Sequence, residues 1–188
     1  MNKADLIENI GKCQYLLDEM SIKQTHVDDM LSFFKTTFDE FGLFFNSSLA
    51  WMHADEQAKN KLPLPFPALK IDVNRRAESQ KEGEQAVEKF GKYILEATGI
   101  INDSNAVRDE YEVFNKEVTV FYNAFSKSVN KMMAAGADVD AMGRMSNKYL
   151  MNIKEWDEKT TVILRRVRRL DERVKDIRSR INALRGIN

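Results

Sequence analysis

The sequence predicts an all-α fold, an elongated antiparallel bundle of about four helices with long first and last helices and coiled-coil character. Apolar residues recur in threes and fours over long stretches, and the β-branched and aromatic residues follow that helical spacing rather than the alternation of strands. Only three prolines (63, 65 and 67) and eight glycines interrupt the chain. We therefore expect one elongated helical domain over residues 1–188, with a Pro-rich linker at 60–71.

The last helix carries the clearest pattern, an unbroken 4-3 spacing of seam residues between 149 and 184. These residues are Tyr149, Ile153, Trp156, Thr160, Ile163, Val167, Leu170, Val174, Ile177, Ile181 and Leu184. Every a position is β-branched, and nearly all residues outside the seam are charged or polar. A stripe this narrow predicts packing against other helices.

The same helix is basic, with nine Lys or Arg against three acids between residues 165 and 185. The basic residues are Arg165, Arg166, Arg168, Arg169, Arg173, Lys175, Arg178, Arg180 and Arg185. Arg165, Arg168 and Arg169 fall at f, b and c positions, away from the seam. We predict that this basic surface binds a partner protein, with an acidic surface as the best match for planar guanidinium groups.

The two ends of the chain have opposite charge. Residues 1–50 hold four basic and eight acidic side chains, whereas residues 151–188 hold eleven basic and six acidic ones. This predicts that the first and last helices pack antiparallel, with Asp5, Glu8, Asp18 and Glu19 near the basic cluster. In this interpretation the basic residues neutralise the chain's own acidic end.

The first helix is expected from about residue 3 to 53, with seam positions running from Leu6 to Met52. A rival interpretation breaks it near Ser21, because Thr25 to Asp28 resembles a capping box. The preserved phase favours one continuous helix. Its apolar stripe is wide enough to contact more than one neighbour.

Residues 41–54 contain no Lys, Arg, Asp or Glu. This segment could be the closed end of a bundle, a subunit interface, or a membrane-inserting tip. The candidate tip residues are Phe41, Leu43, Phe44, Phe45, Leu49, Trp51 and Met52. The segment is too short to span a bilayer.

The middle of the chain is expected to contain two further helices. Pro63, Pro65 and Pro67 break the helix at residues 60–71, which could be a linker, a strap over the bundle or a docking peptide. A helix resumes near Val73 with a polar, solvent-exposed first part, and a turn or stutter is predicted between Gly99 and Asn105. Gly136 is predicted to close the third helix, and Asp138 to cap the fourth, which ends at Arg185. The four predicted helices have about 50, 30, 30 and 48 residues, and the sequence leaves open whether the second and third are separate or continuous.

The sequence offers no recognisable catalytic chemistry. Cys13, the only cysteine, lies on an apolar stripe and is expected to be a core residue, while His26 is expected on the surface and His53 at a helix end. The histidines lack the Glu-x-x-His spacing of a di-iron bundle, and no phosphate-binding glycine motif occurs. We expect no enzyme activity, no metal and no cofactor. No cleaved secretory signal or transmembrane span is visible, which indicates a cytoplasmic or assembly-associated protein.

Three functions are compatible with these observations. The first is a structural or assembly protein, similar to a scaffold or adaptor, that acts through protein contacts and could form homo-oligomers. The second is a membrane-active, pore-forming type of helical protein that uses the apolar residues 41–54. The third is nucleic-acid binding through the basic helix, which the overall charge balance disfavours because basic and acidic residues number 29 each.

Overall fold

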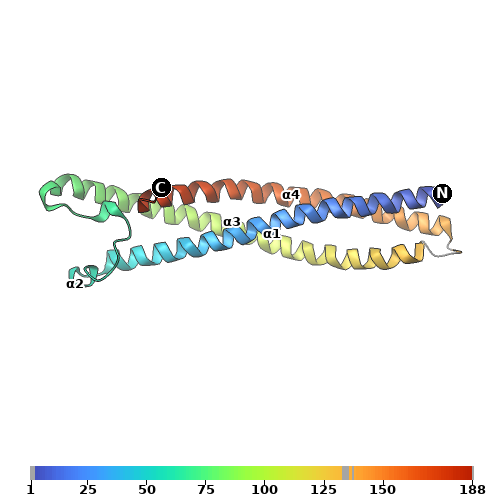
Figure 1. Cartoon of the computed structure of the whole chain (residues 1–188), viewed down its shortest axis with the longest axis horizontal. Helices are drawn as coiled ribbons and strands as arrows, with labels where there is room; N and C mark the ends of the chain where they lie inside the picture. Colours follow the sequence, from blue (N-terminus) through green and yellow to red (C-terminus); the bar gives the residue numbers. More distant parts are fainter. Residues whose placement is uncertain (1–2, 133–135, 137, 188) are drawn as a thin grey trace. The chain divides into compact units, whose positions relative to one another are not determined.

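The protein is all-α in the computed structural model, which describes residues 3–132, 136 and 138–187. The elements are α1 (Lys3–His53), α2 (Glu56–Lys59), two 3₁₀ turns η1 (Pro67–Leu69) and η2 (Val73–Arg75), α3 (Arg76–Met132) and α4 (Val139–Arg185) (Figure 1). No strand occurs in these described ranges. The predicted fold class, a helical bundle with long first and last helices, is confirmed.

The chain divides into two compact units. Unit 1 comprises residues 1–30 and 106–168, and unit 2 comprises residues 31–105 and 169–188. Each of the three long helices contributes one segment to each unit. The core of each unit is therefore built from α1, α3 and α4.

In unit 1, α1 and α4 run parallel. Asn9 of α1 hydrogen-bonds Asn147 of α4 at 2.7 Å, and further along both helices Lys23 pairs with Asp157 at 2.6 Å. Residue numbers thus rise together along the two helices. Helix α3 runs the opposite way, since Glu110 pairs with Arg166 whereas Ser128 hydrogen-bonds Tyr149.

In unit 2 the three helices have the same relative directions as in unit 1. Glu40 of α1 pairs with Arg178 at 3.1 Å, and Phe44 lies 5.3 Å below the guanidinium of Arg185. Helices α3 and α4 again run in opposite directions, because Asp103 pairs with Arg173 and Glu96 with Arg180. Each unit is a bundle in which α3 is antiparallel to two helices that are parallel to each other.

The predicted antiparallel packing of the first and last helices is therefore wrong. Because α3 is one long helix, the chain reverses between α1 and α3 and again between α3 and α4, so α4 regains the direction of α1. Four arginines of α4 pair with acids of other helices, and three of those acids lie on α3, namely Asp103, Glu96 and Glu110. Asp5, Glu8, Asp18 and Glu19 do not supply those partners.

The turn or stutter predicted between Gly99 and Asn105 is absent, because α3 continues through these residues as one helix (Figure 1). Ala97, Ile100, Ser104 and Val107 are all buried, and their spacing of three, four and three residues keeps the heptad phase. The sequence prediction assigned Ile101 to the core instead of Ile100 and did not place a serine there. Ser104 keeps the stripe in register although its hydroxyl finds no partner among the described residues.

Helix α1 is continuous, as predicted. The proposed cap at Thr25 is instead a hydrogen bond within the helix, from the Thr25 hydroxyl to the Ser21 carbonyl at 3.1 Å. Beyond Phe34 the buried positions are Thr37, Phe41, Phe44 and Ser48, rather than the expected Phe38 and Phe45. The wide apolar stripe lets α1 contact both α3 and α4.

The seam of α4 is confirmed. All five a positions are buried, and so are three of the five d positions, with Trp156 and Leu184 half-buried. At its start, the Asp138 carboxylate accepts hydrogen bonds from the backbone N–H groups of Asp140 and Ala141, which confirms the predicted cap. Gly136 has a φ of +80°, a conformation typical of glycine beside a helix end. Residues 133–135, which the prediction assigned to the end of the third helix, lie outside the described part.

The Pro-rich segment 60–71 is part of unit 2 and buries the ring of Phe66 in its core. Phe66 is buried, and its ring lies 5.7 Å from that of Phe90 and 6.3 Å from that of Phe44. Leu62 and Leu64 remain exposed. The following polar start of α3, residues 76–85, is largely exposed as predicted.

Replacement of Ser104 by Ala is expected to stabilise the protein by about 1 kcal/mol. The change removes a buried hydroxyl without a hydrogen-bond partner and adds a better helix former. Ser128→Ala on the same helix is the matched control, because it removes a 2.9 Å hydrogen bond to Tyr149 and should lower stability. Urea unfolding of both variants measures the difference. A destabilised Ser104→Ala protein would contradict the assignment.

Candidate interaction surfaces

The described residues hold no cluster of side chains that could bind a metal ion. No group of three or more His, Cys, Asp or Glu side chains could ligate a metal ion within residues 3–132, 136 and 138–187. His26 is exposed, and His53 is the last residue of α1, both as expected. Burial raises the pKa of the Cys13 thiol to about 11, so this cysteine is an unreactive core residue at neutral pH. The surfaces of the helices are the remaining candidates.

Part of the predicted basic cluster is engaged within the protein. Four arginines form ion pairs with other helices: Arg166 with Glu110, Arg173 with Asp103, Arg178 with Glu40 and Arg180 with Glu96. Lys175 pairs with Asp171 within α4, and Arg185 lies over the ring of Phe44. The five arginines therefore help to hold α4 against the other helices.

The other three arginines of the basic cluster are not engaged in this way. Arg165, Arg168 and Arg169 are exposed, and no acidic side chain in the described part of the chain pairs with them. All three lie on α4 outside its buried seam. These three residues, the outer arginines, match the prediction that the f, b and c positions face away from the bundle.

Arg180 and Glu96 form the most extensive charge contact of unit 2. Both terminal nitrogens of Arg180 donate to the Glu96 carboxylate, one of them at 2.8 Å, and Asp176 accepts a further contact at 2.6 Å. The Arg180 guanidinium also lies 5.4 Å from the Tyr93 ring centre. These hydrogen bonds lower the pKa of Glu96 and raise the pKa of Arg180.

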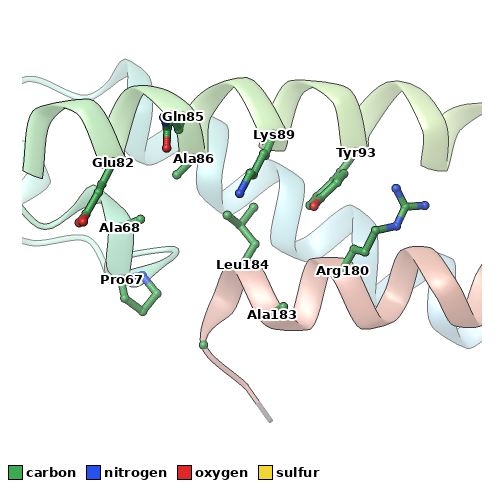
Figure 2. Close-up of a pocket in the computed structure, with 11 residues that line it drawn as sticks. Pro67, Ala68, Glu82, Gln85, Ala86, Lys89, Tyr93, Arg180, Ala183 and Leu184 are labelled. Atoms are coloured by element: carbon green, nitrogen blue, oxygen red, sulfur yellow. The ribbon is translucent and has the colours of Figure 1, made fainter. Parts of the chain in front are cut away.

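A cavity of about 510 Å³ lies beside this pair in unit 2. Figure 2 shows Lys89 and Tyr93 of α3 extending toward Leu184 and Arg180 of α4, while Pro67 and Ala68 lie at one end. Helix α4 ends there at Arg185, and a Cβ atom on the following Gly186 would come within 3.1 Å of Pro67. The lining of this cavity combines acidic, basic and apolar side chains without a nucleophile beside a general base. We therefore assign the cavity no chemistry.

The segment 41–54 does not form a free apolar tip in unit 2. Phe41 and Phe44 are buried, Phe45 is half-buried, and the rings of Phe44 and Phe45 both pack edge-on against Phe90. Trp51 is half-buried with Lys59 over its ring at 5.2 Å, and Met52 is half-buried. The two exposed members are Leu43 and Leu49. The apolar composition of this segment is thus used mainly for packing within the unit.

An apolar groove between α3 and α4 of unit 1 was not predicted from the sequence. A cavity of about 530 Å³ is lined by Val113, Phe114, Val162 and Ile163 together with charged side chains, and a second of about 590 Å³ by Val120, Phe121, Ala124 and Trp156. Val113, Val120 and Val162 are 60%, 71% and 51% exposed. Their positions outside the heptad seams were the only sequence signal for this groove.

Comparisons with known protein families, with curated proteins and with solved structures found no match to this chain. No helix within the described ranges is both long enough and apolar enough to cross a bilayer.

Replacement of Glu96 by Gln is expected to lower stability at neutral pH by less than about 1 kcal/mol, because the pair is partly exposed and screened by solvent. The folded-state pKa of Glu96 lies below its ordinary value of 4.5, so the pair stabilises the protein above that pH. Its contribution is lost as the pH falls through the lowered pKa. The difference from wild type should therefore vanish in acid.

Urea unfolding as a function of pH measures this difference. Glu112→Gln is the control, since Glu112 is exposed on the same helix and has no ion pair among the described residues. A Glu96→Gln effect that stays constant from neutral pH to about pH 3 would contradict the assignment.

Proposed function

We propose that this protein is a non-enzymatic assembly protein, similar to a scaffold or adaptor, and that it binds other protein surfaces through the outer face of α4. The observation that carries the proposal is the division of the basic cluster. Four of its arginines bind acidic residues of the bundle, whereas the outer arginines Arg165, Arg168 and Arg169 are exposed without a partner in the described part of the chain.

Electrostatics supports a protein partner with acidic groups. Like charges so close together on one helix repel one another and gain nothing within the bundle. An acidic surface would relieve that repulsion, and a planar guanidinium can donate two parallel hydrogen bonds to one carboxylate. The rest of the chain supports this function by supplying a packed bundle that presents α4 as a preformed helix.

The test is charge reversal of the outer arginines, Arg165→Glu, Arg168→Glu and Arg169→Glu in one chain. Circular dichroism first confirms that the variant remains helical, which is expected because all three side chains are exposed. Immobilised wild-type and variant chains are then compared for capture of proteins from the native host at moderate salt. We expect the variant to lose the partner that wild type retains.

A matched control changes the same amount of charge elsewhere. Lys35, Lys81 and Lys127 are exposed, and none has an ion pair in the ranges that the structure describes. Their replacement by Glu should leave capture intact. Equal capture by wild type and the arginine variant would refute the proposal, and so would salt-sensitive retention of duplex DNA with no protein partner, because that result would assign the arginines to phosphate.

A further inference from the structure

Helix α3 carries a second apolar stripe beside its buried one. Val113, Val120 and Ala124 lie seven and four residues apart, so they share one side of the helix, and all three are exposed. The buried stripe at the same level consists of other residues, among them Phe114 and Val118. A helix with apolar residues on two sides can pack against helices on both of them. In unit 1 the described residues leave the second side uncovered.

The second stripe forms the α3 wall of the apolar groove of unit 1. The two cavities of the groove share Glu117 of α3, so they are continuous with each other. On the α4 wall, Val162 is 51% exposed and the ring of Trp156 is half-buried. Between Val113 and Ala124 the groove follows about 17 Å of α3, which is the length of about three helical turns.

The charged side chains along the groove are mainly acidic. The first cavity, beside Val113 and Val162, is lined by four glutamates and one lysine: Glu110, Glu117, Glu155, Glu158 and Lys159. Arg166 offsets Glu110, with which it pairs, so the net charge here is −2. Lys116 lines only the second cavity. The groove therefore combines exposed apolar side chains with an excess of negative charge.

The series of ion pairs between α3 and α4 is interrupted at this groove. Its acids Asp103 and Glu110 lie seven residues apart on α3, so the next position is Glu117, which comes level with Lys159. Lys159 is bound instead within α4, to Glu155 at 3.1 Å. Glu117 thus lines both cavities without an ion pair in the part of the chain that the structure describes.

Glu158 on the α4 wall is also without an ion pair among the described residues. Lys154 and Arg165 lie four and seven residues from it on the same side of α4, but neither of them lines the groove. Glu117 and Glu158 therefore place one unpaired carboxylate on each wall. A ligand with positive charge on both of its sides is attracted by this arrangement, and an acidic ligand is repelled.

We infer that the groove binds a basic amphipathic helix of another protein, which packs beside α3 and α4 as a fourth helix of unit 1. Apolar side chains of that helix cover Val113, Val120 and Val162. Lys or Arg residues on the two sides of its apolar face pair with Glu117 and Glu158. The inference goes beyond the proposed function, because it concerns a different surface, opposite in charge to the outer arginines.

A second copy of this chain does not supply such a helix. The basic part of α4 has its apolar seam, including Val167 and Leu170, buried in its own bundle. The exposed apolar residues of the groove itself are accompanied by glutamates, which would repel the glutamates of a second copy. Because exposed ion pairs are individually weak, burial of the valines supplies most of the affinity, and the charges select a basic partner over an acidic one.

The probe is a synthetic helix-forming peptide of about 18 residues, with Leu at its seam positions and Lys on both sides of them. A second peptide of the same length has Glu in place of every Lys. The protein is the full chain with Trp51→Phe, which leaves Trp156 in the groove as its only tryptophan. Titration followed by Trp156 fluorescence gives both affinities. We expect a Kd of about 1–100 µM for the Lys peptide and binding at least about tenfold weaker for the Glu peptide.

Reversal of the two unpaired carboxylates should reverse this preference. With Glu117→Lys and Glu158→Lys, the Lys peptide should bind about tenfold more weakly and the Glu peptide more tightly. The matched control, Asp18→Lys with Asp29→Lys, makes the same charge change on exposed residues of α1 in unit 1 and should leave both affinities unchanged. Circular dichroism verifies that both variants remain helical.

Three results would overturn the inference. The first is the absence of a saturable change in Trp156 fluorescence with the Lys peptide up to about 1 mM. The second is equal affinity for the two peptides, or an unchanged preference after reversal at Glu117 and Glu158, because charge would then not select the partner. The third is a dimer of the full chain in sedimentation equilibrium that Val113→Lys with Val162→Lys dissociates, because that result would assign the groove to a second copy.

Discussion

The structure depends on the heptad phase that α3 keeps through Ala97, Ile100, Ser104 and Val107. Because these four residues stay on one side of the helix, α3 buries a continuous stripe against α1 and α4 instead of turning between Gly99 and Asn105. One serine maintains this phase at the cost of a buried hydroxyl without a partner. Burial of apolar area along the stripe outweighs that cost, since each large side chain contributes about 1.5–3 kcal/mol.

The continuity of α3 also decides how charge is distributed. With α3 antiparallel to both other helices, its acids come level with g positions of α4, where Arg166, Arg173 and Arg180 lie. These exposed pairs are individually weak, worth about 0–1 kcal/mol, so they set the register more than the stability. The outer arginines have no such neighbour in the part of the chain that the structure describes, and they are exposed at the surface.

The α-helical class, the seam of α4, the continuity of α1 and the Asp138 cap were predictable because each depends on local spacing. The number of long helices was not, because a polar residue in a heptad core position, Ser104, looks like a loop residue when read by composition. The antiparallel direction of α4 relative to α1 was inferred from the opposite charges of the two chain ends, and most of the arginines concerned pair instead with acids of α3.

The candidate surfaces were predictable only in part. The outer arginines followed from their heptad positions alone. The groove beside Val113 and Val162 depends on which surfaces of two antiparallel helices are left uncovered, which is tertiary information. Likewise, the apolar composition of residues 41–54 could not reveal that Phe66 and Phe90 would cover the rings of Phe44 and Phe45.

The parallel arrangement of α1 and α4 can be tested most directly by disulfide trapping in unit 1. Asn9→Cys with Asn147→Cys introduces thiols at two positions whose native side chains hydrogen-bond at 2.7 Å, in a chain whose own thiol is removed by Cys13→Ala. Mild oxidation should form an intramolecular disulfide in this protein and none with Asn9→Cys and Asn182→Cys. A disulfide in the second protein but not in the first would show antiparallel helices and contradict the account.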